Sequence, residues 1–133
     1  MSKEPWDWDE NDLIHLIKDG IDENQELEYK GADSLQKTEQ RKVEIGKDIS
    51  AFANSAGGII VYGIKESSDS PPRIPIDVEG IDPGQITKEW LDQVISSRVS
   101  PRIDGLRINP VWLKDKNSGK VAYVIHVSQG TTA

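Results

Sequence analysis

The segment EQRKVEIGKDISAFANSAGGIIVYGI, residues 39–64, decides the fold because two glycines join a helical pattern to a buried-strand pattern. Spacings of three and four residues place its apolar side chains on one stripe of a helix. The stripe consists of Ile45, Ile49, Phe52, Ala53 and Ala56. Thr38 is a suitable N-cap, and Gly57 is suited to the left-handed conformation that commonly ends a helix. The apolar run at residues 59–64 then predicts a central strand that is buried on both faces.

Patterns before this segment predict one more helix and one more strand. Residues 13–17 carry four apolar side chains in a helical pattern, with Asp9 or Asn11 as the N-cap. In ELEYK, residues 26–30, polar and apolar residues alternate, which is typical of a half-buried strand. Its two faces consist of Leu27 and Tyr29 on one side and of Glu26, Glu28 and Lys30 on the other.

Patterns after this segment predict the remaining elements. The proline-containing residues 74–78 predict a short edge strand, because proline cannot donate to a strand ladder. Residues 86–100 predict a helix that begins near Thr87. Residues 106–128 predict two strands joined by a turn at residues 117–119, which form a C-terminal β-hairpin. The order of these elements predicts an α+β fold, with a mixed β-sheet and helices packed on it.

The length of 133 residues suits one domain with one core. We expect residues 1–20 to form an acidic lead-in with a helix, and residues 21–133 to form the body of this domain. The sequence stops after a predicted strand without a terminal helix or charged tail, so we expect a fragment of a longer protein. It shows no signal or transit pattern, no apolar run of membrane-spanning length and no cysteine. These features favour a cytoplasmic protein without a membrane partner.

The net charge of −7 is unevenly distributed along the chain. Up to and including Glu28 there are ten acidic and two basic residues, which gives a balance of −8. The remainder has thirteen acidic and fourteen basic residues, a balance of +1. Because local patches set contact electrostatics, the acidic total does not exclude a phosphate-binding surface on the rest of the domain.

A group of carboxylates around the predicted strand 26–30 is the candidate catalytic and metal site. Glu28 and Lys30 project from the same strand face, and Glu23 approaches from the preceding turn. Converging carboxylates repel each other unless a divalent ion neutralises them, and Mg²⁺ or Mn²⁺ prefers such oxygen ligands. A metal ion beside a lysine is an arrangement used for phosphodiester cleavage, because both stabilise negative charge on the phosphate.

A third acid, Glu66, lies just beyond the predicted strand 59–64, where ligands gather at the rim of α/β sheets. If this strand and strand 26–30 are neighbours, Glu23, Glu28 and Glu66 can meet at one metal ion. The alternative is that these acids are ordinary charges at the rim, with Lys30 paired to Glu28.

The candidate nucleic-acid-binding residues are basic and lie in the second half of the chain. They are Lys88, Arg98, Arg102 and Arg107, together with Lys114, Lys116 and Lys120 on the predicted hairpin. Such a surface binds the phosphate backbone, although the interspersed acids Glu89, Asp92 and Asp104 are equally consistent with a solvated face.

Three stretches resemble the Schlafen AlbA_2 domain, a module of Schlafen proteins and many bacterial proteins that is associated with nucleic-acid binding. They are ENQELEYK, DISAFANSAGGIIVYGI and ISSRVSPRIDGL. Glu23, Glu28 and Lys30 match the first motif of the family, and residues 48–58 match its helix that ends in Gly-Gly. The resemblance covers residues 21–128, nearly the whole domain.

The resemblance implies a mixed α/β domain whose animal members include metal-dependent endoribonucleases that cleave structured RNA such as tRNA. Their three-carboxylate active site corresponds here to Glu23, Glu28 and Glu66, which implies a Mg²⁺ or Mn²⁺ cofactor. At the third place this chain has Lys65-Glu66 where the family often has aspartate, and the longer side chain changes the ligand geometry.

The resemblance leaves a second function open, because many bacterial members are described as DNA-binding or regulatory modules of larger proteins. The alternative is therefore a non-catalytic module that binds DNA or another protein. The expected partner is RNA or DNA, and further candidates are the rest of a longer chain and a second copy of this one. No P-loop occurs, which argues against an ATP site within this fragment, and no Ser/His/Asp arrangement occurs, which argues against hydrolase chemistry of that kind.

Overall fold

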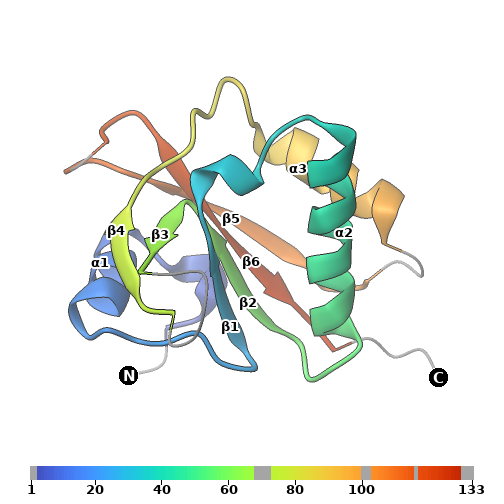
Figure 1. Ribbon diagram of the computed structural model, residues 1–133, viewed down its shortest axis with the longest axis horizontal. Coiled ribbons are helices and arrows are strands. Elements are labelled where there is room, and N and C mark those ends of the chain that lie inside the picture. The colour runs from blue at the N-terminus through green and yellow to red at the C-terminus, as the bar shows by residue number, and fades with distance from the viewer. Residues whose placement is uncertain (1–2, 68–72, 100–102, 116, 130–133) are drawn as a thin grey trace.

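The computed structural model describes residues 3–67, 73–99, 103–115 and 117–129, and it shows an α+β fold with helices packed on a mixed sheet (Figure 1). The helical elements are η1 (Pro5–Asp7), α1 (Glu10–Lys18), η2 (Ala32–Ser34), α2 (Glu39–Ala53) and α3 (Lys88–Arg98). The strands are β1 (Leu27–Lys30), β2 (Gly58–Tyr62), β3 (Ile64–Glu66), β4 (Pro75–Val78), β5 (Arg107–Trp112) and β6 (Val121–Val127). The predicted fold class is confirmed.

The sheet has four strands in the order β1-β2-β6-β5. Strand β1 pairs in parallel with β2, so Lys30 lies beside Tyr62, and the other two pairings are antiparallel. The condition set for the three-carboxylate hypothesis, that strand 26–30 neighbours the strand after the two glycines, is therefore met. The predicted C-terminal hairpin of β5 and β6 is confirmed. Since β1 lies at one edge of the sheet, one side of its backbone has no strand partner among the described residues.

The α2–β2 unit forms for the reasons that its sequence indicates. The Thr38 hydroxyl accepts a hydrogen bond from the Arg41 N–H at 3.3 Å and caps α2. Gly57 has φ +80°, and its N–H donates to the Phe52 carbonyl at 2.8 Å. A Cβ at this position would lie 2.5 Å from the Val127 carbonyl oxygen, so only glycine fits the turn. The same turn directs the chain into the middle of the sheet.

The strand predicted for residues 59–64 is interrupted at Gly63, which corrects that prediction. Gly63 has φ +107°, a conformation that side-chain-bearing residues rarely adopt, and the chain leaves the four-stranded sheet there. Residues from Ile64 onward form β3, which pairs antiparallel with β4 in a separate two-stranded sheet. Glu66 therefore lies on this second sheet and not on the extension of β2.

Side chains on the two faces of the four-stranded sheet form two core clusters. In Figure 1, α2 and α3 cover one face, whereas α1 and the β3–β4 pair lie on the other side. Ile60, Tyr62 and Ile125 pack toward α2 and α3, and Tyr29 and Val61 pack in the second cluster with the N-terminal helix. The fully buried sheet centre explains why β2 reads as a continuous apolar run.

The acidic N-terminal segment packs against the second face of the sheet. Asp9 caps α1 through a capping box with Asp12, which decides between the two predicted N-caps in favour of Asp9. Leu13 is completely buried, and the Asn109 side chain donates to the carbonyls of Pro5 and Trp8 at 3.0 Å. No helix among the described residues is long and apolar enough to cross a membrane.

Candidate functional site

Glu23 lies along the free edge of β1, where the chain folds back on itself before the strand. Asn24 and Leu27 form a bridge there, and the Tyr29 N–H donates to Glu23 Oε2 at 2.9 Å. This carboxylate satisfies a backbone donor that no strand partner reaches. Its other oxygen, Oε1, lies 3.6 Å from the Arg73 guanidinium. Glu23 therefore has a structural role at the edge of the sheet, whatever else it binds.

Glu66 lies next to Glu23, at the end of β3. Burial above all, together with hydrogen bonding and charge repulsion from Glu23, raises the pKa of Glu66 to about 7. The nearby charges of Arg73 and Lys30 oppose this shift of the pKa. The Oε2 atom of Glu66 is buried and has no hydrogen-bond partner among the described residues. A cation or a proton at this position would relieve both the repulsion and the unpaired oxygen.

Glu28 and Lys30 lie on the face of β1 that is turned toward α2. The Lys30 ammonium is 3.0 Å from Glu28 Oε2 and 3.9 Å from Asp48 Oδ2, on α2. Burial raises the pKa of Asp48 to about 6; Lys30 lowers this pKa, and the charges of Glu28 and Glu44 raise it. The ion pair between Lys30 and Glu28, expected as the alternative to a metal site, is present.

The three acids predicted to share one metal ion therefore lie in two places. Glu23 and Glu66 are adjacent at the edge of β1, and Glu28 is paired with Lys30 on the α2 side. In the part of the chain that the structure describes, three or more acidic, histidine or cysteine side chains are nowhere grouped as in a metal centre. Lys30 joins the two places, since both Glu23 and Glu28 help to raise its pKa against the effect of burial.

An open cavity of about 550 Å³ lies beside Lys30 and Glu66. It is lined by Lys30, Gly31, Asp33, Ser34, Lys65, Glu66, Ser67, Arg73 and Glu79. Three of these residues are cationic (Lys30, Lys65 and Arg73) and three are acidic (Asp33, Glu66 and Glu79), so the lining is balanced in charge. Its cationic side chains can contact an anionic group, and its acids can be neutralised by a cation.

Two residues that sequence reasoning missed, Asp48 and Tyr62, complete the α2 side. Asp48 lies between Ile45 and Ile49, two buried residues of the apolar helical stripe. An acidic residue this close to the buried face of a helix is the sequence signal that could have identified Asp48 as a site residue. Tyr62 is completely buried, and its hydroxyl has no hydrogen-bond partner among the described residues. Burial, together with the charges of Asp48 and Glu28, holds the Tyr62 pKa well above its usual value.

The candidate nucleic-acid-binding residues do not share one surface. Arg98, on α3, is ion-paired with Glu39 at 2.5 Å, next to the helical layer. Arg107 projects from the opposite face of the sheet, where its guanidinium carbon lies 4.1 Å from the ring centre of Trp6. Lys88 is exposed at the start of α3, and Lys114 and Lys120 are exposed at the hairpin. Arg102 and Lys116 lie outside the described residues.

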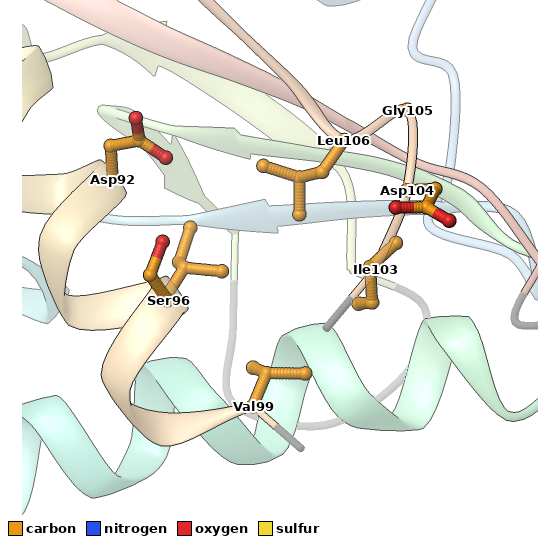
Figure 2. Close-up of a pocket in the computed structure, with 8 residues that line it drawn as sticks. Asp92, Ser96, Val99, Ile103, Asp104, Gly105 and Leu106 are labelled. Atoms are coloured by element: carbon orange, nitrogen blue, oxygen red, sulfur yellow. The ribbon is translucent and has the colours of Figure 1, made fainter. Parts of the chain in front are cut away.

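A separate cavity of about 140 Å³ lies between α3 and residues 103–106 (Figure 2). Figure 2 shows the side chains of Val99, Ile103 and Leu106 around it, together with the carboxylates of Asp92 and Asp104. Its lining includes none of the predicted site residues, and two acids beside it weaken this side as a phosphate-binding surface.

Comparison with known proteins identifies the class of this fold. The family model for Schlafen, AlbA_2 matches residues 23–133, and the chain belongs to that family. The solution NMR structure of the N-terminal domain of a RecG-related protein from Nitrosomonas europaea is similar, with a TM-score of 0.58 and 20% sequence identity. The match covers 92% of this chain and 74% of that one, and it shows a shared fold. No curated protein matches the sequence.

Proposed function

We propose that this AlbA_2 domain binds nucleic acid and cleaves structured RNA with the help of Mg²⁺ or Mn²⁺. The observation that carries the proposal is the pair of Glu23 and Glu66, in which a buried Glu66 oxygen has no partner among the described residues beside the 550 Å³ cavity. The family membership and the likeness to a domain of a protein named for an ATP-dependent DNA helicase support a nucleic-acid ligand.

The residues present fit a metal ion that keeps most of its waters. Mg²⁺ is commonly held by one or two carboxylates together with substrate phosphates, and Glu23 and Glu66 supply two adjacent carboxylates. Glu28 is the third ligand that we propose, although its carboxylate is paired with Lys30 at 3.0 Å. When bound, such a metal ion polarises a phosphate and lowers the pKa of a coordinated water.

The side chains of the protein itself then position and stabilise the phosphodiester. Lys30 lines the large cavity and carries a positive charge that stabilises negative charge developing on the phosphate. Lys65 and Arg73 line the same cavity and add to its attraction for a nucleic-acid backbone. Glu66, with its pKa raised to about 7, can hold or release a proton near neutral pH when no cation is bound.

The direct test is cleavage of labelled tRNA and single-stranded DNA by purified protein with Mn²⁺. We expect Glu66→Gln to lower the rate of RNA cleavage by at least about 100-fold while the protein remains folded. Asp33→Asn is the matched control, because Asp33 lines the same cavity with an exposed side chain. Equal rates for wild type and Glu66→Gln would reject the catalytic role of Glu66.

The second candidate function is a non-catalytic binding module. It is favoured by the structural contacts of Glu23 with the β1 edge and of Glu28 with Lys30, which do not require a metal ion. In that case RNA or DNA remains intact with Mn²⁺, and its affinity for the protein falls steadily as salt concentration rises. If neither nucleic acid binds at low salt, a protein partner becomes the better explanation.

A further inference from the structure

Lys30 lies between two cavities. One is the 550 Å³ cavity, which also includes Glu66. The other has a volume of about 200 Å³ and lies between β1, β2 and α2. It is lined by Lys30, Ser34, Arg41, Glu44, Ile45, Lys47, Asp48 and Tyr62. The Lys30 side chain can therefore direct its ammonium group toward either cavity.

Asp48 is held firmly on the side of the smaller cavity. Ile45 and Ile49, which flank it on α2, are at most 1% exposed, so the direction of the helix face is fixed by the core. From this position the Asp48 carboxylate approaches the Lys30 ammonium to 3.9 Å, while Glu28 holds the same group at 3.0 Å. Asp48 is not one of the three predicted metal ligands, so its contact with Lys30 is additional to the predicted three-carboxylate site.

Tyr62 is independent evidence that polar groups belong to the smaller cavity. It lies opposite Lys30 in the β1–β2 register and is completely buried. Tyr62 is among the residues that line this cavity, and its hydroxyl is buried without a hydrogen-bond partner among the described residues. A buried hydroxyl without a partner is costly, so the Tyr62 hydroxyl offers an unused hydrogen bond in the cavity that Asp48 and Lys30 also line.

We propose that Asp48 is a positioning residue for Lys30, which draws the ammonium group toward Tyr62 and away from a phosphate in the larger cavity. The proposal rests on the proposed function, because the phosphate is that of the nucleic-acid backbone. When Asp48 loses its negative charge, the ammonium is held by Glu28 alone and turns more readily toward the phosphate. Asp48 thus sets how much of the charge of Lys30 is available to the ligand.

The proposal predicts a dependence on pH. The groups that face Asp48 are Lys30 and Glu28 from β1, Tyr62 from β2, and Arg41, Glu44 and Lys47 from α2. Because burial raises the pKa of Asp48 to about 6, its carboxylate is mostly charged at pH 7.5 and mostly neutral at pH 5. Lowering the pH through this range therefore removes the charge of Asp48 beside Lys30, and it also neutralises Glu66, whose pKa is about 7.

The test combines Asp48→Asn with a matched control, Glu44→Gln. Glu44 lies on the same helix and lines the same cavity, but its ion pair, at 3.0 Å, is with Arg41. We expect Asp48→Asn to bind a short labelled RNA roughly threefold more tightly at pH 7.5, the size expected for one partly solvated ion pair. Glu44→Gln should change the affinity less, and the gain from Asp48→Asn should vanish in a Lys30→Met background.

A second readout does not depend on nucleic acid. The ¹⁵N resonance of the Lys30 ammonium should shift between pH 7.5 and 5 in the wild type, and this shift should be clearly smaller in Asp48→Asn, in which the contribution of Glu66 remains. If the resonance is the same in both proteins, the positioning role is wrong even when RNA binds. If the resonance behaves as expected but no RNA binds, the contact stands and the proposed function fails.

Tyr62→Phe keeps the test decisive if Asp48→Asn does not fold. This variant removes only the unpaired hydroxyl, so it should fold and weaken the attraction of the ammonium to the smaller cavity. A change in the Lys30 resonance in Tyr62→Phe supports the proposal. The proposal is overturned if the Lys30 resonance is the same in Tyr62→Phe as in the wild type and the wild-type resonance does not shift between pH 7.5 and 5.

Discussion

The two carboxylate pairs on either side of β1 differ in what neutralises them. At the α2 side, Glu28 and Asp48 share the Lys30 ammonium, at 3.0 and 3.9 Å. At the free edge, Glu23 and Glu66 lie together, and Glu66 retains a buried oxygen without a partner among the described residues. Each pair has a basic side chain nearby, Lys30 for the first and Arg73 for the second, but only the second pair has a raised glutamate pKa together with this unpaired oxygen. This difference indicates where an external cation has most to contribute.

The largest expected effect concerns Mn²⁺ binding by the two pairs. Glu66→Gln should weaken Mn²⁺ binding by roughly 10- to 100-fold, because it removes one of the two adjacent edge carboxylates. Asp48→Asn should leave Mn²⁺ binding nearly unchanged, because Lys30 already neutralises that side. Isothermal titration with Mn²⁺ measures both variants, and an equal loss in both would show that the pairs are not distinct.

The stability of the edge pair should depend on pH. A glutamate in the unfolded chain has its ordinary pKa of 4.5, and the folded-state pKa of Glu66 is about 7. Because the folded-state pKa of Glu66 is raised, protonation of Glu66 favours the folded state. This contribution to stability is fully present below pH 4.5 and is lost as the pH rises through 7.

Glu66→Gln should therefore raise the free energy of unfolding at pH 8 by about 1 kcal/mol after solvent screening, with little effect at pH 4. Urea denaturation at the two pH values measures this difference. The same substitution should then stabilise the protein while it weakens metal binding and cleavage. A loss of stability at pH 8 would contradict the raised pKa of Glu66.

Removing the edge carboxylate itself should have the opposite sign. Glu23→Ala leaves the Tyr29 N–H without its acceptor and should lower the free energy of unfolding by roughly 1–2 kcal/mol. Glu26→Ala is the control, since Glu26 is exposed in the same turn and its side chain forms no hydrogen bond or ion pair among those found in the described residues. Thermal unfolding of both variants checks the prediction, and equal stabilities would remove the structural role of Glu23.

The smallest effect tests whether Lys30 connects the pairs. Its charge lowers the pKa of both Asp48 and Glu66, so Lys30→Met should raise both pKa values above their present values of about 6 and about 7. Lys65→Met is the control, because Lys65 lines the large cavity but is not among the groups that shift either pKa. Carbon-detected NMR titration of the side-chain carboxyls measures both, and a shift confined to Asp48 would separate the two pairs.

Much of the fold could be predicted because its signals are local. Thr38, Gly57 and the apolar run that follows specify a helix, its end and a buried strand within one continuous segment. The alternation around Glu28 and Lys30 likewise places both on one strand face. These properties depend on residues that are close in sequence, which a single sequence displays directly.

The arrangement of the site could be predicted only in part because it depends on contacts between distant segments. The contact of Glu23 with the Tyr29 N–H follows from the absence of a strand partner at that edge, which the sequence does not indicate. The approach of Asp48 to Lys30 depends on how α2 crosses β1. The break at Gly63 places Glu66 on another sheet. In the sequence this region looks like one continuous apolar strand.

Gly63 also determines where the chain tolerates changes in length. Its N–H donates to the Lys30 carbonyl at 2.8 Å, and its carbonyl accepts from Glu79 at 2.8 Å and Gly80 at 3.2 Å. Hydrogen bonds from Gly63 thus hold the end of β1 and the residues that follow β4, and Gly63 itself directly follows the end of β2. One residue inserted next to Gly63 would break these hydrogen bonds and displace Glu66 relative to Lys30. For protein engineering, the chain length at Gly63 should therefore stay unchanged.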